Sequence, residues 1–105
     1  MAPLTQSLLQ IPVRPGAEND FAQRFRAQRV FEHAASIRGF RGGRLLRPLE
    51  PGGSFVVSAD WDSPDAYQAW LGAPIRDQLT RAIDDLVDGA MTVALFVDAT
   101  DEGSA

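Results

Sequence analysis

The chain of 105 residues has no cysteine, one histidine, no lysine and no long hydrophobic run. Without cysteine there can be no disulfide, thiolate metal site or thiol nucleophile, and a single histidine argues against a histidine-built zinc centre. The longest nearly apolar stretch, residues 90–97, is far shorter than the roughly 20 residues that a membrane helix needs. Residues 1–10 lack the charged start and apolar centre of a signal peptide. We therefore expect a cytoplasmic protein that holds no metal and contacts no membrane.

Positive charge is also scarce. Ten arginines stand against fourteen acidic residues, so the formal net charge is −4. Because nucleic-acid binding depends on neutralising phosphates with Lys and Arg, this balance argues against a nucleic-acid partner. The length and the hydrophobic share of 45% suit a single globular domain. We place that domain at residues 1–98 and an acidic flexible tail at residues 99–105.

Apolar residues at every second position, bounded by glycine or proline turns, predict four strands. Apolar residues at helical spacing predict the helices between them. The predicted strands span residues 7–13, 44–47, 54–61 and 91–97. The predicted helices span residues 17–37, which contain no glycine or proline, residues 64–71, and residues 75–86. Ser63 is a natural cap for the second helix, because its hydroxyl can accept a free backbone N–H and Pro64 follows it.

The order strand, helix, strand, strand, helix, strand is typical of a ferredoxin-like α+β fold with an antiparallel four-stranded sheet. Its helices cover only one face of that sheet. The last predicted strand has apolar residues on both faces, with Val93 and Leu95 on one and Phe96 on the other. An apolar surface of this kind usually marks an interface, so we expect a homodimer in which sheet packs on sheet.

The segment from Phe55 to Leu71 carries a family resemblance. A strand ending in Trp61, a polar cap at Ser63, and aromatic residues at Tyr67 and Trp70 resemble the antibiotic biosynthesis monooxygenase family of dimeric α+β barrels. Pro74, the Pro-Gly pair after the first strand and the segment Gly39-Phe40-Arg41-Gly42 are similar too, so the resemblance covers most of residues 10–97. The family includes quinone-forming monooxygenases, haem degraders and polyketide cyclases.

The resemblance also implies site residues. Cofactor-free family members hold the substrate with a Trp, a Tyr, an Asn and an Arg, and Trp61 and Tyr67 match the first two. The Asn position is occupied by Val57. The Arg position falls on Arg81 when the segments are counted without a gap, and on Thr80 when Pro74 and Leu79 anchor the comparison. Haem-degrading members use an axial histidine near the position of Thr80, and threonine cannot supply that ligand. Haem degradation is therefore less favoured here.

Other candidates come from the residues themselves. His33 has the only side chain whose ordinary pKa suits proton abstraction near neutrality, which makes it a candidate base or simply a surface histidine. The remaining substrate-binding candidates are residues of the predicted helices and strands that an aromatic ligand would contact. The phenylalanines among them would equally suit a plain hydrophobic core, and Gln28 and Glu32 would equally suit the solvent-facing margin of a helix. They are Phe21, Phe25, Gln28, Glu32, Phe55, Val57, Trp70 and Leu79.

These features favour a cofactor-independent monooxygenase that acts on an aromatic polyketide-type phenol or hydroquinone in natural-product biosynthesis. Such a reaction needs molecular oxygen and a substrate that gives an electron to it once deprotonated, and it needs no metal or organic cofactor. Two alternatives stay open. The same pocket suits a polyketide cyclase, and a non-catalytic barrel that binds a small molecule would carry the same residues.

Overall fold

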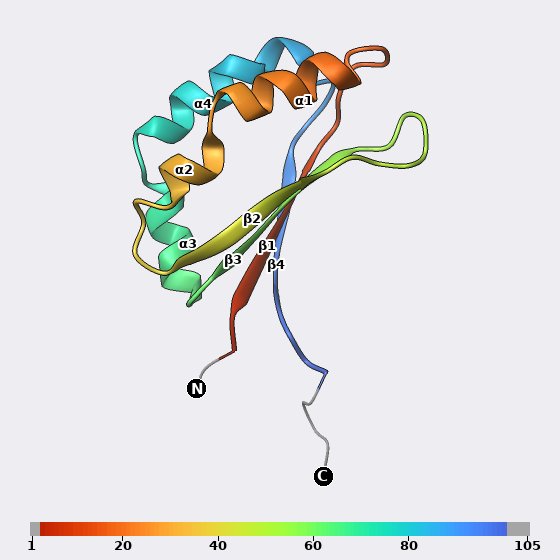
Figure 1. The fold of residues 1–105 in the computed structure, drawn as a ribbon. Helices are drawn as coiled ribbons and strands as arrows, with labels where there is room; N and C mark the ends of the chain where they lie inside the picture. Colours follow the sequence, from red (N-terminus) through yellow and green to blue (C-terminus); the bar gives the residue numbers. More distant parts are fainter. Residues whose placement is uncertain (1–2, 101–105) are drawn as a thin grey trace.

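The strand-forming segments assemble into one antiparallel sheet that carries the helices on a single face (Figure 1). The structure is a computed structural model and describes residues 3–100. Its strands are β1 (Thr5–Ile11), β2 (Phe40–Leu46), β3 (Phe55–Trp61) and β4 (Thr92–Val97), in the order β2-β3-β1-β4. Every neighbouring pair is antiparallel. The predicted ferredoxin-like α+β fold is therefore confirmed.

The pairing register decides which side chains face the helices. Ile11 lies opposite Phe55, and Thr5 lies opposite Trp61, so these residues share one face of the two central strands. Ile11, Phe55 and Trp61 are each 1% exposed. The helices thus cover β1 and β3, and the core lies between them and the sheet.

Four helices form the covering layer: α1 (Glu18–Ala27), α2 (Val30–Ala34), α3 (Pro64–Leu71) and α4 (Ile75–Ile83), which continues into a short 3₁₀ turn, η1 (Asp84–Leu86). The predicted cap of α3 is present, because the Ser63 Oγ accepts a hydrogen bond from the Ala66 backbone N–H at 3.3 Å. Among the described residues, no helix is both long enough and apolar enough to cross a membrane.

The prediction of one helix over residues 17–37 is wrong. α1 ends at Ala27, Arg29 takes a left-handed conformation with φ of 53°, and α2 starts at Val30. In one continuous helix Phe25 and Phe31 would point about 120° apart. The break instead brings their ring centroids to 5.7 Å, with Phe31 beside the sheet.

Strand boundaries also differ from the sequence-based expectation. β1 stops at Ile11, and Val13 forms only an isolated bridge with Val87. β2 starts at Phe40 rather than at residue 44, and its pairing shifts by one residue between Phe40 and Gly42. Of the predicted tail, residues 101–105 lie outside the described residues.

Aromatic side chains fill the space between the layers. The chain has six phenylalanines, two tryptophans and one tyrosine. Eight of these nine rings form a continuous row in which neighbouring centroids are 4.8 to 6.4 Å apart. The row runs Phe55, Phe21, Phe25, Phe31, Phe40 and Trp61, and ends on Tyr67 and Trp70. At Trp61 the indole Nε1–H donates to the Ser7 Oγ at 3.0 Å, which satisfies the one polar atom of that buried ring.

The fourth strand is left without a cover. All six residues of β4 are exposed, including Val93 at 47% on the helix side and Phe96, the ninth aromatic, at 49% on the opposite side. Leu46 at the other edge of the sheet is exposed as well. Apolar surface of this extent on both edge strands is unusual for a monomer.

Close packing at Gly43 gives a stability prediction. A Cβ at this position would lie 2.3 Å from the Phe31 ring, so Gly43→Ala forces the ring out of its place in the aromatic row. We expect the free energy of unfolding in urea to fall by about 1–3 kcal/mol, the usual effect of overpacking.

Gly72→Ala is the matched control. Gly72 has a negative φ of −84° and no atom within 3.6 Å of an added Cβ, so its free energy of unfolding should stay unchanged or rise slightly. Equal losses in the two variants would contradict the packing of Phe31 on Gly43.

Candidate functional site

A cavity of about 590 Å³ lies under the helices on the side of the sheet where β4 is uncovered. β1, β3 and β4 supply its floor, and α1, α3 and α4 supply its walls. Most of its lining is apolar: Leu9, Ile11, Phe25, Val30, Val57, Trp70, Leu71, Leu79, Ile83, Met91, Val93 and Leu95. Since Val93 and Leu95 are exposed, the cavity opens at β4. Its volume suits a ligand of several fused rings.

Few polar groups face this cavity. They are Gln28, Tyr67, Gln68, Arg76 and Thr80, and among the described lining residues only Arg76 carries a charge. Among residues 3–100, the lining includes no carboxylate and no imidazole. A mostly apolar space with a single guanidinium favours an apolar ligand that carries, or can develop, one negative charge.

Trp61 borders a second, smaller space. This hollow of about 40 Å³ is lined by Trp61, Phe31 and Phe40, and it shares seven lining residues with the large cavity: Leu9, Val30, Val57, Tyr67, Trp70, Arg76 and Val93. It has room for a molecule of the size of water or dioxygen. Because the Trp61 N–H is already bonded to Ser7, this indole acts as a wall and not as a hydrogen-bond donor to a ligand.

Tyr67 and Arg76 border both spaces. Burial raises the pKa of the Tyr67 hydroxyl above its ordinary value, and the positive charge of Arg76 partly opposes that rise. The hydroxyl therefore keeps its proton at neutral pH and is a donor. The Arg76 guanidinium carbon lies 5.9 Å from the centre of the Trp70 ring, a cation–π contact that holds the group over the wall of the cavity.

The structure brings six of the predicted site residues together at the large cavity and places Trp61 at the small hollow beside it. The six are Phe25, Gln28, Val57, Tyr67, Trp70 and Leu79.

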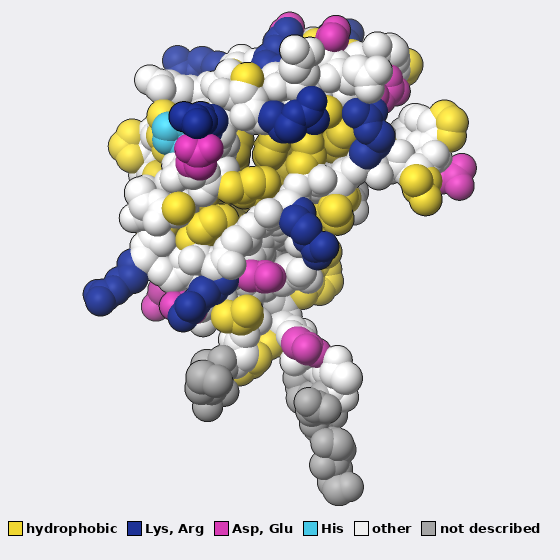
Figure 2. Space-filling model, viewed as in Figure 1, with side chains coloured by type: hydrophobic (Ala, Val, Ile, Leu, Met, Phe, Trp, Pro, Cys, Tyr) yellow, Lys and Arg dark blue, Asp and Glu magenta, His cyan; other side chains and the backbone are white. Residues whose placement is uncertain are grey.

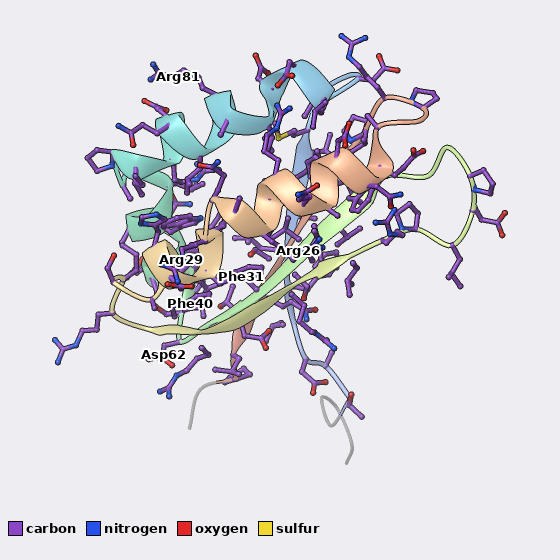
Figure 3. All side chains as sticks on the ribbon, turned by 45° about the horizontal axis from the view of Figure 1, so that its top comes forward. Arg26, Arg29, Phe31, Phe40, Asp62 and Arg81 are labelled. Carbon is purple, nitrogen blue, oxygen red and sulfur yellow. The ribbon has the colours of Figure 1, made fainter. Side chains whose placement is uncertain are left out.

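Arg81 does not join them. Its side chain is on the outer side of α4, where the Nε–H donates to the Asp77 carbonyl at 3.3 Å (Figure 3). Thr80, the other residue that the comparison with the family left open, faces the cavity instead. The difference follows from helix geometry, since adjacent residues point about 100° apart.

Four other predicted residues also lie outside the large cavity. His33 is exposed on α2 and lines none of the described hollows. Phe21 and Phe55 are buried against each other with centroids 4.8 Å apart, so their role is the core. Glu32 is exposed and forms an ion pair with Arg29 at 3.1 Å.

Arg76 is the site residue that the sequence analysis missed, although the signal was present. Arg76 and Ile83 are seven residues apart on one predicted helix, which places them about 20° apart around its axis. Arg76 thus lies at the edge of the apolar stripe of α4, next to Ile83. An arginine at that edge can reach toward the apolar interior, and its contact with Trp70 places it there.

The chain is 38% identical over 65 residues to a protein from Mycobacterium tuberculosis named "Heme oxygenase (mycobilin-producing)", and the match covers 61% of this chain and 59% of that one. SnoaB, a cofactor-independent oxygenase from Streptomyces nogalater, has a similar structure with a TM-score of 0.76 at 26% identity, covering 92% of this chain and 94% of SnoaB.

A Bordetella bronchiseptica protein described as an antibiotic biosynthesis monooxygenase has a TM-score of 0.79 at 20% identity, over 91% of this chain and 97% of that one, and so shares the fold. The family model for antibiotic biosynthesis monooxygenase matches residues 7–82, which include β1 from Ser7 onward, β2, β3, all four helices up to Ala82 and most of the cavity wall. The chain belongs to the antibiotic biosynthesis monooxygenase family.

Proposed function

We propose that the protein is a cofactor-independent monooxygenase that oxidises a phenol or hydroquinone of the aromatic polyketide type to a quinone. The observation that carries the proposal is the composition of the large cavity, in which Arg76 and Tyr67 line a mostly apolar space. SnoaB, which is named a cofactor-independent oxygenase, adds support from a relative of known fold.

In this reaction the substrate itself supplies the electrons. A deprotonated anthrone or phenol passes one electron to dioxygen, and the two radicals combine at carbon to form a peroxide. Loss of water then leaves a new carbonyl, so one oxygen atom enters the product and the other leaves as water. The protein has to bind a flat ring system, stabilise its anion and leave room for oxygen.

Each of these tasks has a group in the cavity. Arg76 stabilises the substrate anion, and Tyr67 donates a hydrogen bond to the same oxygen. The hollow beside Trp61 gives dioxygen a place next to the bound ring. Since no carboxylate or imidazole is among the described lining residues, the substrate ionises through its own acidity, which the guanidinium increases.

Haem oxidation is the second candidate, because the Mycobacterium tuberculosis relative is named a haem oxygenase. The chain spans 59% of that relative's length. Against this candidate, His33 is exposed on α2, and the only described cavity residues with an atom suited to haem iron are Tyr67 and Met91. A Soret shift on titration with hemin, abolished by Tyr67→Phe or Met91→Leu, would favour haem over a phenolic substrate.

We also propose that the protein works as a cytoplasmic homodimer, with the uncovered sheet face and β4 at the subunit contact. The exposure of Leu46, Phe96 and Val97 supports this arrangement. Light scattering at micromolar concentration should give twice the 11.4 kDa subunit mass, and a mass of one subunit would overturn the dimer.

Arg76→Gln tests the proposed reaction. Oxygen uptake with an anthrone should show kcat/KM reduced about 100-fold, as for the loss of one preorganised donor to an anionic centre. Arg76→Lys should retain more activity than Arg76→Gln, because it keeps the positive charge.

Arg81→Gln is the matched control. It removes the same charge from the same helix outside the cavity and should leave kcat/KM unchanged. Product formation without oxygen would indicate a cyclase, and wild-type activity in Arg76→Gln would contradict the role of the guanidinium.

The pH dependence tests the absence of a protein base. Because only the ionised substrate reacts, kcat/KM should rise with pH, and the midpoint should move with the pKa of the substrate across a series of substituted anthrones. His33→Gln should leave the profile unchanged. A midpoint that stays the same for every substrate and moves in His33→Gln would instead indicate a histidine base.

A further inference from the structure

A separate hollow of about 380 Å³ lies between the α1–α2 break and the edge strand β2. Its lining residues are Phe25, Arg26, Arg29, Val30, Phe31, Glu32 and Leu45. Figure 2 shows apolar side chains in a recess between these helices and the sheet, with arginine side chains at its margin. The proposed reaction uses neither its arginines nor its space.

The base of this hollow is apolar and firmly packed. The Phe31 ring lies against Gly43 on β2, where a Cβ would come within 2.3 Å of it. Phe25 supports Phe31 from α1, with a centroid distance of 5.7 Å in an edge-on contact. Leu45 adds an aliphatic surface from β2. A flat ring could therefore rest on this base without displacing the core.

The rim has a positive excess. Arg29 pairs with Glu32 at 3.1 Å, whereas Arg26 forms no ion pair with any residue of 3–100. Two guanidinium groups and one carboxylate thus border the hollow, in a chain whose net charge is −4. Figure 3 shows Arg26 and Arg29 at the two ends of the break, with Phe31 between them. A planar guanidinium without a partner is suited to bidentate binding of a carboxylate.

The backbone at the rim is strained. Arg29 is the one residue other than glycine with a positive φ among those the structure describes. A long side chain is unfavourable in that conformation, and such outliers gather at functional sites. Here the outlier produces the helix break that forms the hollow, and it carries one of the two guanidinium groups.

The hollow is distinct from the large cavity. Phe25 and Val30 line both spaces and form the wall between them, whereas Tyr67, Trp70 and Arg76 line only the cavity side. The two spaces also flank opposite edges of the sheet, β2 for the hollow and β4 for the cavity.

We infer that this hollow is a second ligand site, which binds a small aromatic carboxylate. The ring packs on Phe31 and Leu45, and the carboxylate accepts hydrogen bonds from Arg26, with Arg29 as the second positive group. The inference does not rest on the proposed reaction, since it requires only binding.

Binding of 2-naphthoate, followed by amide chemical shifts of the full chain, tests this site. Shifts should concentrate in residues 25–32 and at Leu45, and the affinity should fall as salt rises. The neutral analogue 2-naphthamide should bind about tenfold more weakly, because it lacks the charge that Arg26 recognises. Equal affinity for the two probes, or shifts confined to Tyr67, Trp70 and Val93, would overturn the proposal.

Two substitutions locate the charge recognition. Arg26→Gln should weaken 2-naphthoate binding about tenfold. Arg29→Gly removes the second guanidinium, so 2-naphthoate binding should weaken. Because glycine adopts the positive φ of this position without strain, the free energy of unfolding should stay the same or rise. Arg81→Gln, the control for overall charge, should bind as the wild type does. Unchanged affinity in the combined Arg26→Gln and Arg29→Gly variant would contradict the site.

Discussion

A row of eight aromatic rings sets the spacing between the helices and the sheet, and the remaining features depend on it. Phe55 and Trp61 anchor the row on β3, while Phe21, Phe25 and Phe31 carry it along the first two helices. Rings of this size hold the helices away from the strands. Three rings of the row, Phe25, Tyr67 and Trp70, also line the large cavity, which extends to β4. The aromatic core and the cavity thus lie in the same layer, between the helices and the sheet.

The polar chemistry of the cavity is concentrated in very few atoms. Val57, at the position to which the family resemblance assigns an amide, lines both the cavity and the small hollow. In the proposed reaction, recognition of the negative charge therefore depends on Arg76, which contacts Trp70. Because the cation is fixed and the surroundings are apolar, its effect on a bound anion is larger than it would be in water.

Much of the architecture was predictable from local patterns. A half-buried strand shows in a sequence as alternating apolar residues, and a capped helix shows as a capping residue before an apolar period. Such patterns in β1, in β3 and at Ser63 predicted the ferredoxin-like order of elements. The break at Arg29 left no such pattern in the sequence. No glycine or proline marks it, and the left-handed backbone is compensated by the distant packing of Phe31 on Gly43.

The residues of the candidate site also differ in whether a local sequence pattern predicts them. Leu79 belongs to the apolar stripe that the helical period predicts for residues 75–86, and the family resemblance indicated Tyr67 and Trp70; all three line the cavity. The family resemblance allows Arg81 or Thr80, and one position along a helix is enough to turn a side chain outward, as it does for Arg81. Arg76 lies at the edge of the apolar stripe of α4, next to Ile83, and its contact with Trp70 is what turns it toward the cavity.

Both indoles of the chain stand in the wall of the two connected spaces, Trp61 at the small one and Trp70 at both. Their ring centroids are 6.4 Å apart, and Tyr67 lies 5.7 Å from Trp61. Ultraviolet emission from the whole protein therefore originates within a few ångströms of any guest in the cavity. In the proposed reaction, the quinone product accepts excitation energy and electrons readily, so it would quench that emission as it forms.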